Sequence, residues 1–371
     1  MYFNVILNLL VSFLLTYLVI PPIVRISNAR NLMDTPNSRK LNISEVPVLG
    51  GIGIFIGLSL TTLIFLPVNH LNPTFRSLFA ALILMLFVGM KDDILLVSPR
   101  KKLLAQFIAA AILVFAGGFR ISQFHGLAFQ FDLPYLFSAA LSVAFILFLI
   151  NAINLIDGID GLAAGISLLV AIALGAWFLL GGYMAYGMAC TALSGSLLAF
   201  LRFNLWGKKN KLFMGDTGSL ILGTFLAAMI IKFNELNQDL LSPFYMKQAP
   251  VIALSLMIVP VSDTLRVFTI RLWHKQSPFT PDKNHFHHLL IKSGLSHIQA
   301  SCFLVYYTTL FTAMAFLLQA YLDITFHFLL LLTLSFSFIG LIYLRSKQQL
   351  TGSKVIASIH TFRPAPFRRR G

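Results

Sequence analysis

The sequence predicts an all-α polytopic membrane protein of about eleven transmembrane helices, with its N-terminus outside and its C-terminus in the cytoplasm. Of its 371 residues, 57% are hydrophobic and only 11% are charged, and the mean hydropathy is +0.83. A soluble globular domain is far less apolar. The apolar residues also gather into runs near the roughly 20 residues that a helix needs to cross a bilayer, and the basic residues occupy alternate loops.

Eleven apolar runs justify the predicted helices in chain order. They cover residues 4–24, 46–66, 75–90, 103–118, 136–152, 162–180, 183–202, 218–232, 250–272, 301–320 and 324–344. The first run lacks a basic leader and a small-residue cleavage site, so we interpret it as a retained span. Residues 119–135 partly alternate polar and apolar side chains, which favours a small hairpin. We therefore expect one transmembrane domain over 1–345 and a basic cytoplasmic tail over 346–371.

The distribution of charge predicts the orientation. Of the 28 Lys and Arg residues, 24 fall in one set of loops, and cytoplasmic loops are the ones enriched in these residues. The same loops hold 9 of the 13 acidic residues, so the net charge of +15 lies wholly on the predicted cytoplasmic face. That face would meet anionic lipid headgroups and anionic substrates. Because the basic residues are dispersed and form no nucleic-acid module, we expect no nucleic-acid partner.

Two adjacent carboxylates, Asp92 and Asp93, directly follow the run at 75–90. Neighbouring carboxylates repel each other unless a cation or a shared proton relieves them. A divalent metal or a proton-transfer role explains the pair, and a solvated helix end is the alternative. Arg100, Lys101 and Lys102 then precede the next run, at the depth of a lipid phosphate, although they could equally be snorkelling anchors.

The segment NAINLIDGIDGLAAG at 151–165 places Asn154, Asp157 and Asp160 at intervals of three residues, on one side of a helical turn. Its glycines permit close approach of the backbone. Oxygen ligands of this kind suit Mg²⁺, which keeps waters and substrate phosphates in its shell. Packing of small residues between membrane helices is the alternative, but it does not explain the acids.

Asp216, in FMGDTGSL at 213–220, stands at the start of another run. There it could cap the helix or bind a metal. Arg266 and Arg271 lie near the end of the run at 250–272, where the guanidinium fork favours a phosphate partner.

Three histidines follow in HFHHLL: His285, His287 and His288. Such a cluster could act as acid or base, bind phosphate or be structural, whereas zinc is disfavoured because no suitably spaced fourth ligand accompanies it. Together the cytoplasmic loops supply oxygen ligands, cations and imidazoles. These groups are the ones that phosphoryl transfer between a soluble anionic donor and a lipid acceptor needs.

These motifs, in this order, resemble the polyprenyl-phosphate N-acetylhexosamine-1-phosphate transferase family. The resemblance extends from DTPNSRK at 34 to about residue 300 and includes SPFTPDKNHFHHLL. It implies an eleven-span fold in a bacterial inner membrane, a cytoplasmic active site and dependence on Mg²⁺, with Mn²⁺ as a substitute. It further implies transfer of a sugar 1-phosphate from a UDP-sugar to undecaprenyl phosphate with release of UMP, and it is compatible with a homodimer.

Carried over residue by residue, the resemblance implies the site. The predicted catalytic residues are Asp92, Asp93, Asp157, Asp160, His285, His287 and His288. The predicted substrate-binding residues are Lys102, Arg266, Arg271, Asn151 and Gly215. The predicted metal ligands are Asn154 and Asp216. Lys102 would meet the acceptor phosphate, and Arg266 with the histidines would hold the donor.

The histidine segment favours one branch of the family. The peptidoglycan branch, the phospho-N-acetylmuramoyl-pentapeptide transferases, has three consecutive histidines, whereas this chain reads His-Phe-His-His. We therefore expect the N-acetylglucosamine-1-phosphate branch, with the peptidoglycan branch as the alternative. A secondary transporter is a further alternative, but its acids would lie near mid-span in two related halves. A CDP-alcohol phosphotransferase would need a longer acidic motif than this chain has.

Overall fold

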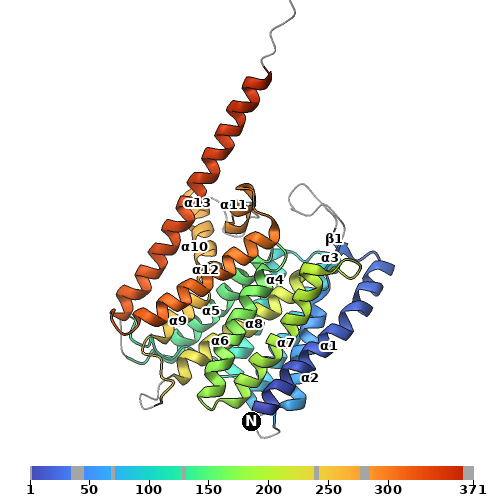
Figure 1. The fold of residues 1–371 in the computed structure, drawn as a ribbon. Coiled ribbons are helices and arrows are strands. Elements are labelled where there is room, and N and C mark those ends of the chain that lie inside the picture. Colours follow the sequence, from blue (N-terminus) through green and yellow to red (C-terminus); the bar gives the residue numbers. More distant parts are fainter. Residues whose placement is uncertain are drawn as a thin grey trace, which may run out of the picture.

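The computed structural model describes residues 2–34, 46–67, 72–127, 131–237, 242–275 and 285–361. These residues form a bundle of helices, beside which β1 (Met33–Asp34) pairs antiparallel with β2 (Val46–Pro47). The chain begins at one end of the bundle, and its last helix leaves at the opposite end (Figure 1). The described residues thus confirm the predicted helical class.

The helices follow the predicted apolar runs. They are α1 (Tyr2–Ala29), α2 (Gly50–Phe65), α3 (Pro73–Leu95), α4 (Pro99–Ala111) with the π-helical turn η2 (Ile112–Ala116), α5 (Tyr135–Ile156), α6 (Leu162–Leu180), α7 (Met184–Trp206), α8 (Gly215–Leu236), α9 (Ala249–Leu256), α10 (Ile258–Trp273), α11 (Phe286–Lys292), α12 (His297–Leu318) and α13 (Ile324–Thr361). Each predicted run coincides with one helix or with one of two pairs, α4 with η2 and α9 with α10.

Among the described residues, seven helices are long and apolar enough to cross a membrane, or eight if the α9–α10 pair counts as one span. That pair is bent by 77°. Pro260, in the first turn of α10, has no amide hydrogen to donate back to Leu256, which favours a break there. The chain is therefore a multi-pass membrane protein, while eleven crossings and the sides of the two termini stay predictions.

Local signals set where several helices begin. Asn72 caps α3 by accepting a hydrogen bond from the amide of Phe75 at 3.1 Å, and Pro73 occupies the first helical position. Ser296 and Gln299 form a reciprocal capping box at the start of α12. α13 continues to Thr361, past the domain boundary expected at 345, and the basic segment RPAPFRRR lies outside the described residues.

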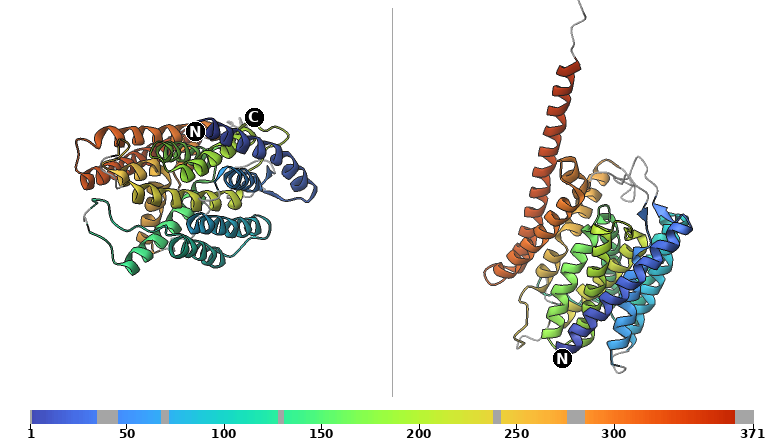
Figure 2. Two further views of the ribbon diagram at one scale, coloured as in Figure 1. Left: turned by 90° about the horizontal axis from the view of Figure 1, so that it is seen from below. Right: turned by 45° about the vertical axis from the view of Figure 1, so that its right-hand side comes forward.

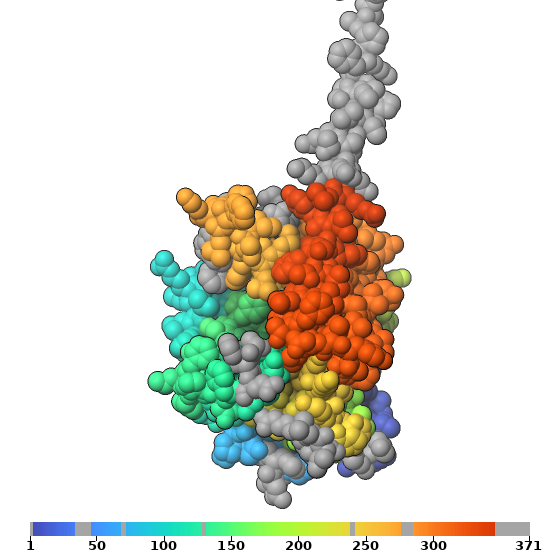
Figure 3. Space-filling model, turned by 90° about the vertical axis from the view of Figure 1, so that its left-hand side faces the viewer, coloured from blue at the N-terminus to red at the C-terminus, as the bar shows by residue number. Residues whose placement is uncertain are grey.

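α8 is the central helix and positions the polar residues of the bundle. It packs against α2, α3, α5, α6 and α9, and its residues from Thr217 to Ile231 are all buried. Seen from below, its yellow-green ribbon lies inside the bundle, between the green helices and the teal ones (Figure 2). α13 lies along one side, next to α10 and α11 (Figure 3). Because the first turn of α8 holds Asp216, the core of the fold fixes this carboxylate at one end of the bundle.

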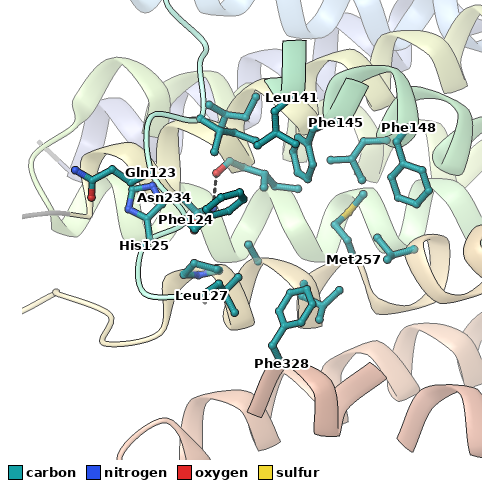
Figure 4. Close-up of a pocket in the computed structure, with 18 residues that line it drawn as sticks. Gln123, Phe124, His125, Leu127, Leu141, Phe145, Phe148, Asn234, Met257 and Phe328 are labelled. Atoms are coloured by element: carbon teal, nitrogen blue, oxygen red, sulfur yellow. Dashed lines mark hydrogen bonds between the residues drawn. The ribbon is translucent and has the colours of Figure 1, made fainter. Parts of the chain in front are cut away.

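The opposite end of the bundle holds the predicted hairpin and an apolar cavity. Gln123 and Asp132 form an isolated antiparallel bridge, and Glu235 on α8 accepts hydrogen bonds from the Ser122 amide at 2.9 Å and from His125 at 3.0 Å. The cavity, of about 300 Å³, lies beneath this loop between α5, α8 and α9 (Figure 4). None of the predicted site residues lines it.

Candidate active site

The predicted polar residues converge where four helix ends meet: the end of α3, the start of α4, the end of α5 and the start of α8. At their centre lies the ammonium group of Lys102, on α4. It is 2.7 Å from Oδ1 of Asp216 and 3.0 Å from Oδ2 of Asp92. The other oxygen of Asp92 accepts a hydrogen bond from the amide of Val97 at 2.6 Å. Lys102 therefore joins three helices through two carboxylates.

Asp93 has a different role from its neighbour Asp92. Its carboxylate accepts hydrogen bonds from the amide of Asp216 at 2.7 Å, and from the amide and hydroxyl of Thr217 at 3.0 and 2.5 Å. It thus satisfies free amide groups at the N-terminus of α8. Burial raises the pKa of Asp93 to about 7, although the Thr217 bonds oppose that change. Asp93 holds α3 against α8.

Gly215 makes this contact sterically feasible. Its φ is +72°, and a Cβ atom built on it would lie 2.6 Å from Oδ2 of Asp93 and would also meet the carbonyl of Val48. We predicted Gly215 as a substrate-binding position. The contacts give it a role in packing the helix ends, since any side chain there would displace Asp93.

The NAINLIDGIDG segment supplies the wall beside Asp216. Asn154 donates from Nδ2 to Oδ1 of Asp216 and, at 2.8 Å, to the hydroxyl of Ser219. Asn151 donates at 2.8 Å to Gln106, a buried residue on α4 that the motif search missed. The two asparagines therefore connect α5 to α8 and α4.

Asp157 and Asp160 have contrasting surroundings. Burial, and next the charge of Asp216, raise the pKa of Asp157 well above its ordinary value. Asp160 instead pairs with Lys211 at 2.7 Å, and its carbonyl accepts a hydrogen bond from Ser301 at 2.6 Å. Asp157 belongs to the carboxylate cluster, whereas Asp160 holds the segment against neighbouring parts of the chain.

The histidine segment lies directly against this acidic segment. A Cβ atom on Gly158 would be 2.9 Å from Cε1 of His287, so only glycine accommodates the ring. His287 is 2% exposed, and within the described part of the chain neither of its ring nitrogens has a hydrogen-bond partner. Burial, and then the charge of His288, lower the pKa of His287 to about 3. His287 is therefore neutral at physiological pH.

Asp263, which the motif search missed, organises the rest of the histidine segment. Its carboxylate is 1% exposed and accepts hydrogen bonds from Arg266 at 2.9 Å, from Nδ1 of His285 at 2.8 Å and from the amide of Phe286 at 2.9 Å. The sequence signal was a carboxylate within an apolar run, three residues before an arginine. Asp263 fixes which nitrogen of His285 points away from it, since Nδ1 is engaged.

The other predicted residues that follow α9 are His288, on α11, and Arg271, on α10. The His288 ring is 4.4 Å from that of His287, between ring centroids. Arg271 is buried in the last turn of α10. The segment SPFTPDKN lies outside the described residues.

The donor set fits a divalent cation only in part. In the described ranges no group of three or more His, Cys, Asp or Glu side chains is arranged to hold a metal. Asn154 presents its amide nitrogen to Asp216, and its oxygen would face the carboxylate only after the amide turned over. However, Lys102 places a positive charge between Asp92 and Asp216, where it stands in for a cation. Oxygen ligands completed by water and phosphate are what Mg²⁺ prefers.

Comparison with known proteins identifies the family. The glycosyl transferase family 4 profile matches residues 75–234. The chain is 32% identical to the "Probable undecaprenyl-phosphate N-acetylglucosaminyl 1-phosphate transferase" of Bacillus subtilis, over 76% of each chain. The chain belongs to the family of undecaprenyl-phosphate N-acetylglucosaminyl 1-phosphate transferases. It is also 28% identical to the undecaprenyl-phosphate alpha-N-acetylglucosaminyl 1-phosphate transferase of Yersinia pestis over 72% of each chain, and 27% identical to that of Escherichia coli K12 over 79% of this chain and 78% of the relative.

The extent of the family 4 match corresponds to one part of the site. Residues 75–234 include the Asp92 pair, Lys102, the NAINLIDGIDG segment and Asp216. Asp263 and the histidines follow the matched region. The contact of His287 with Gly158 joins the two parts.

Proposed function

We propose that this protein transfers N-acetylglucosamine 1-phosphate from UDP-N-acetylglucosamine to undecaprenyl phosphate and releases UMP, as the first membrane step of a cell-surface polysaccharide. Its relatives are named for an N-acetylglucosaminyl 1-phosphate transfer to the same lipid. The observation that carries the proposal is the contact of Lys102 with Asp92 and Asp216, at the end of a membrane bundle and beside the histidine segment.

The charges of the site suit two anionic substrates. The acceptor monophosphate and the donor diphosphate repel each other and the carboxylates, so cations must bring them together. Lys102, Arg266 and Arg271 supply positive charge, and guanidinium groups bind phosphate oxygens in pairs. Mg²⁺, or Mn²⁺ in its place, would when bound polarise the donor phosphate and orient it, with Asp216 and Asn154 as its expected protein ligands.

In the proposed reaction, an oxygen of undecaprenyl phosphate attacks the phosphorus that bears the sugar. The bond from that phosphorus to the bridging oxygen breaks, and UMP leaves with that oxygen. Asp92 is the better candidate to take a proton from the acceptor, because Asp93 is committed to the N-terminus of α8. Burial, and next Asp216, raise the pKa of Asp92, which makes its carboxylate a stronger base.

The predicted orientation assigns this end of the bundle to the cytoplasm of a bacterial inner membrane. UDP-sugars are soluble cytoplasmic compounds, and the loops beside the site carry the basic surplus. The acceptor phosphate would then reach Lys102 from the headgroup layer. A homodimer stays a prediction from the family resemblance.

The test is release of UMP by the purified protein in detergent, with undecaprenyl phosphate and a panel of UDP-sugars. We expect UMP with UDP-N-acetylglucosamine, loss of UMP on chelation and recovery on adding Mg²⁺. UDP-N-acetylmuramoyl-pentapeptide tests the peptidoglycan branch in the same assay. If no UDP-N-acetylhexosamine yields UMP with folded protein, the proposed function is wrong.

A further inference from the structure

The ammonium of Lys102 occupies the position of a cation. It lies 2.7 Å from one carboxylate and 3.0 Å from another, and these two acids come from helices far apart in sequence. The side chains of Lys102, Asp92 and Asp216 are 16%, 8% and 31% exposed, so the contacts are partly shielded from solvent. Two partly buried carboxylates that contact the same ammonium would repel each other without a positive charge between them. In the structure a tethered ammonium provides it.

The hydrogen-bond donors next to Asp92 and Asp216 do not replace the positive charge of Lys102. Asn154 donates to Asp216 and the Val97 amide donates to Asp92, but both groups are neutral. The Asp93 carboxylate is engaged with the first turn of α8. A divalent ion held by Asp216 would need the carboxylate oxygen that the Lys102 ammonium contacts at 2.7 Å. The ion and the ammonium, both positively charged, would therefore exclude each other from this position.

We propose that Lys102 and a divalent metal ion compete for the position between Asp92 and Asp216, and that binding of the metal releases the Lys102 ammonium to a substrate phosphate. The competition rests only on the contacts of Lys102. The identity of the phosphate rests on the proposed function.

The exchange couples the two ligands. A phosphate that attracts the ammonium of Lys102 removes the competitor from the carboxylates, so the metal binds more tightly. By reciprocity, the metal must then tighten binding of the phosphate to the same degree. The protein would therefore hold metal weakly alone and firmly only with a substrate phosphate present.

The direct test measures binding of Mn²⁺ to purified protein in detergent without substrates, by electron paramagnetic resonance of the free ion. Lys102→Met removes the competing charge, and we expect the Mn²⁺ dissociation constant to fall by about tenfold, within the roughly 5- to 150-fold range of ordinary coupling. Lys209→Met, at an exposed position on the same face, is the matched control for net charge and should change it little. An equal or weaker affinity in folded Lys102→Met overturns the proposal.

Two further measurements keep the test decisive. Lys102→Arg keeps the charge, so it should bind Mn²⁺ no more tightly than the unmodified protein; tightening as large as in Lys102→Met would contradict competition. Adding a prenyl monophosphate to the unmodified protein should tighten Mn²⁺ binding, and this effect should vanish in Lys102→Met. If the Mn²⁺ results hold but no UDP-sugar yields UMP, the exchange stands and the proposed function fails.

Discussion

Asp92 and Asp93 are chemically identical neighbours on α3, yet the contacts separate them. Asp93 accepts three hydrogen bonds from the first turn of α8, whereas Asp92 meets the Lys102 ammonium and one amide. A carboxylate that satisfies buried donors contributes to stability, and removing such a partner costs roughly 1–3 kcal/mol. Asp92 faces the Lys102 ammonium and is the proposed acceptor of a proton from the substrate, so we expect it to contribute chiefly to chemistry.

We therefore expect the two asparagine variants to differ. Asp93→Asn should lower the thermal stability of the protein in detergent and also its activity. Asp92→Asn should reduce UMP release by about 100-fold or more, the usual effect of losing an acid–base group, at nearly unchanged melting temperature. Thermal unfolding and UMP release of both variants check this. Equal loss of stability in both would contradict the division of roles.

His287 gives a prediction for the dependence of stability on pH. Its pKa is lowered to about 3 by burial, whereas an exposed histidine titrates near 6.5. The unfolded chain therefore binds the proton more readily than the folded chain between these values. The stabilising effect of a neutral His287 is complete above pH 6.5 and is lost as the pH falls, by about 1.4 kcal/mol per pH unit inside that window.

The measurement compares melting temperatures of the unmodified protein and of His287→Gln between pH 7 and pH 5. We expect the unmodified protein to lose more stability on acidification, because glutamine does not titrate. If the melting temperature falls equally with pH in both proteins, the folded state does not favour the neutral form of His287.

At the scale of elements, Asp263 connects two helices whose relative position shapes the site. It lies within α10 and binds His285 and the first amide of α11. Loss of the Asp263 charge would weaken its contacts with Arg266 and His285, and breaking a buried ion pair costs about 3–5 kcal/mol. Without these contacts, the start of α11 should open more readily, while the rest of the helical bundle stays folded.

Asp263→Asn should speed amide hydrogen exchange in residues 285–292 and raise the KM for the UDP-sugar more than it lowers kcat. Asp323→Asn is the control, because Asp323 caps α13 with hydrogen bonds to the amides of Thr325 and Phe326 at 2.9 and 3.1 Å. Its effect should be confined to the start of α13. Unchanged exchange over 285–292 in Asp263→Asn would be evidence against the connection.

The elements show what hydropathy and motifs could and could not predict. The apolar runs predicted every long helix, because a helix that crosses a membrane needs a continuous apolar sequence. The bend between α9 and α10 was missed, since the residues on both sides of Pro260 are apolar and hydropathy does not reveal the direction of the chain. The pairing of Asp93 with Asp216 and Thr217 was also beyond the sequence, because it joins residues 123 and 124 positions apart.

At the scale of the molecule, the distribution of charge predicts which way the bundle faces. The site end collects the basic loops, and the loop that holds His125 lies at the other end together with the start of the chain (Figure 1). The positive-inside rule then predicts that the site faces the cytoplasm, the side where UDP-sugars are present. The proposed reaction and the predicted topology therefore favour the same orientation.

Labelling of single cysteines tests that orientation. In a background in which Cys190 and Cys302 are replaced, Lys209→Cys should react with a membrane-impermeant maleimide only in inverted vesicles, whereas Gln123→Cys should react only in spheroplasts. UMP release from each variant confirms that the fold is intact. The opposite labelling pattern would place the carboxylate cluster outside, away from any cytoplasmic UDP-sugar, and the proposed function would fail even though the fold and the Lys102 contacts were correct.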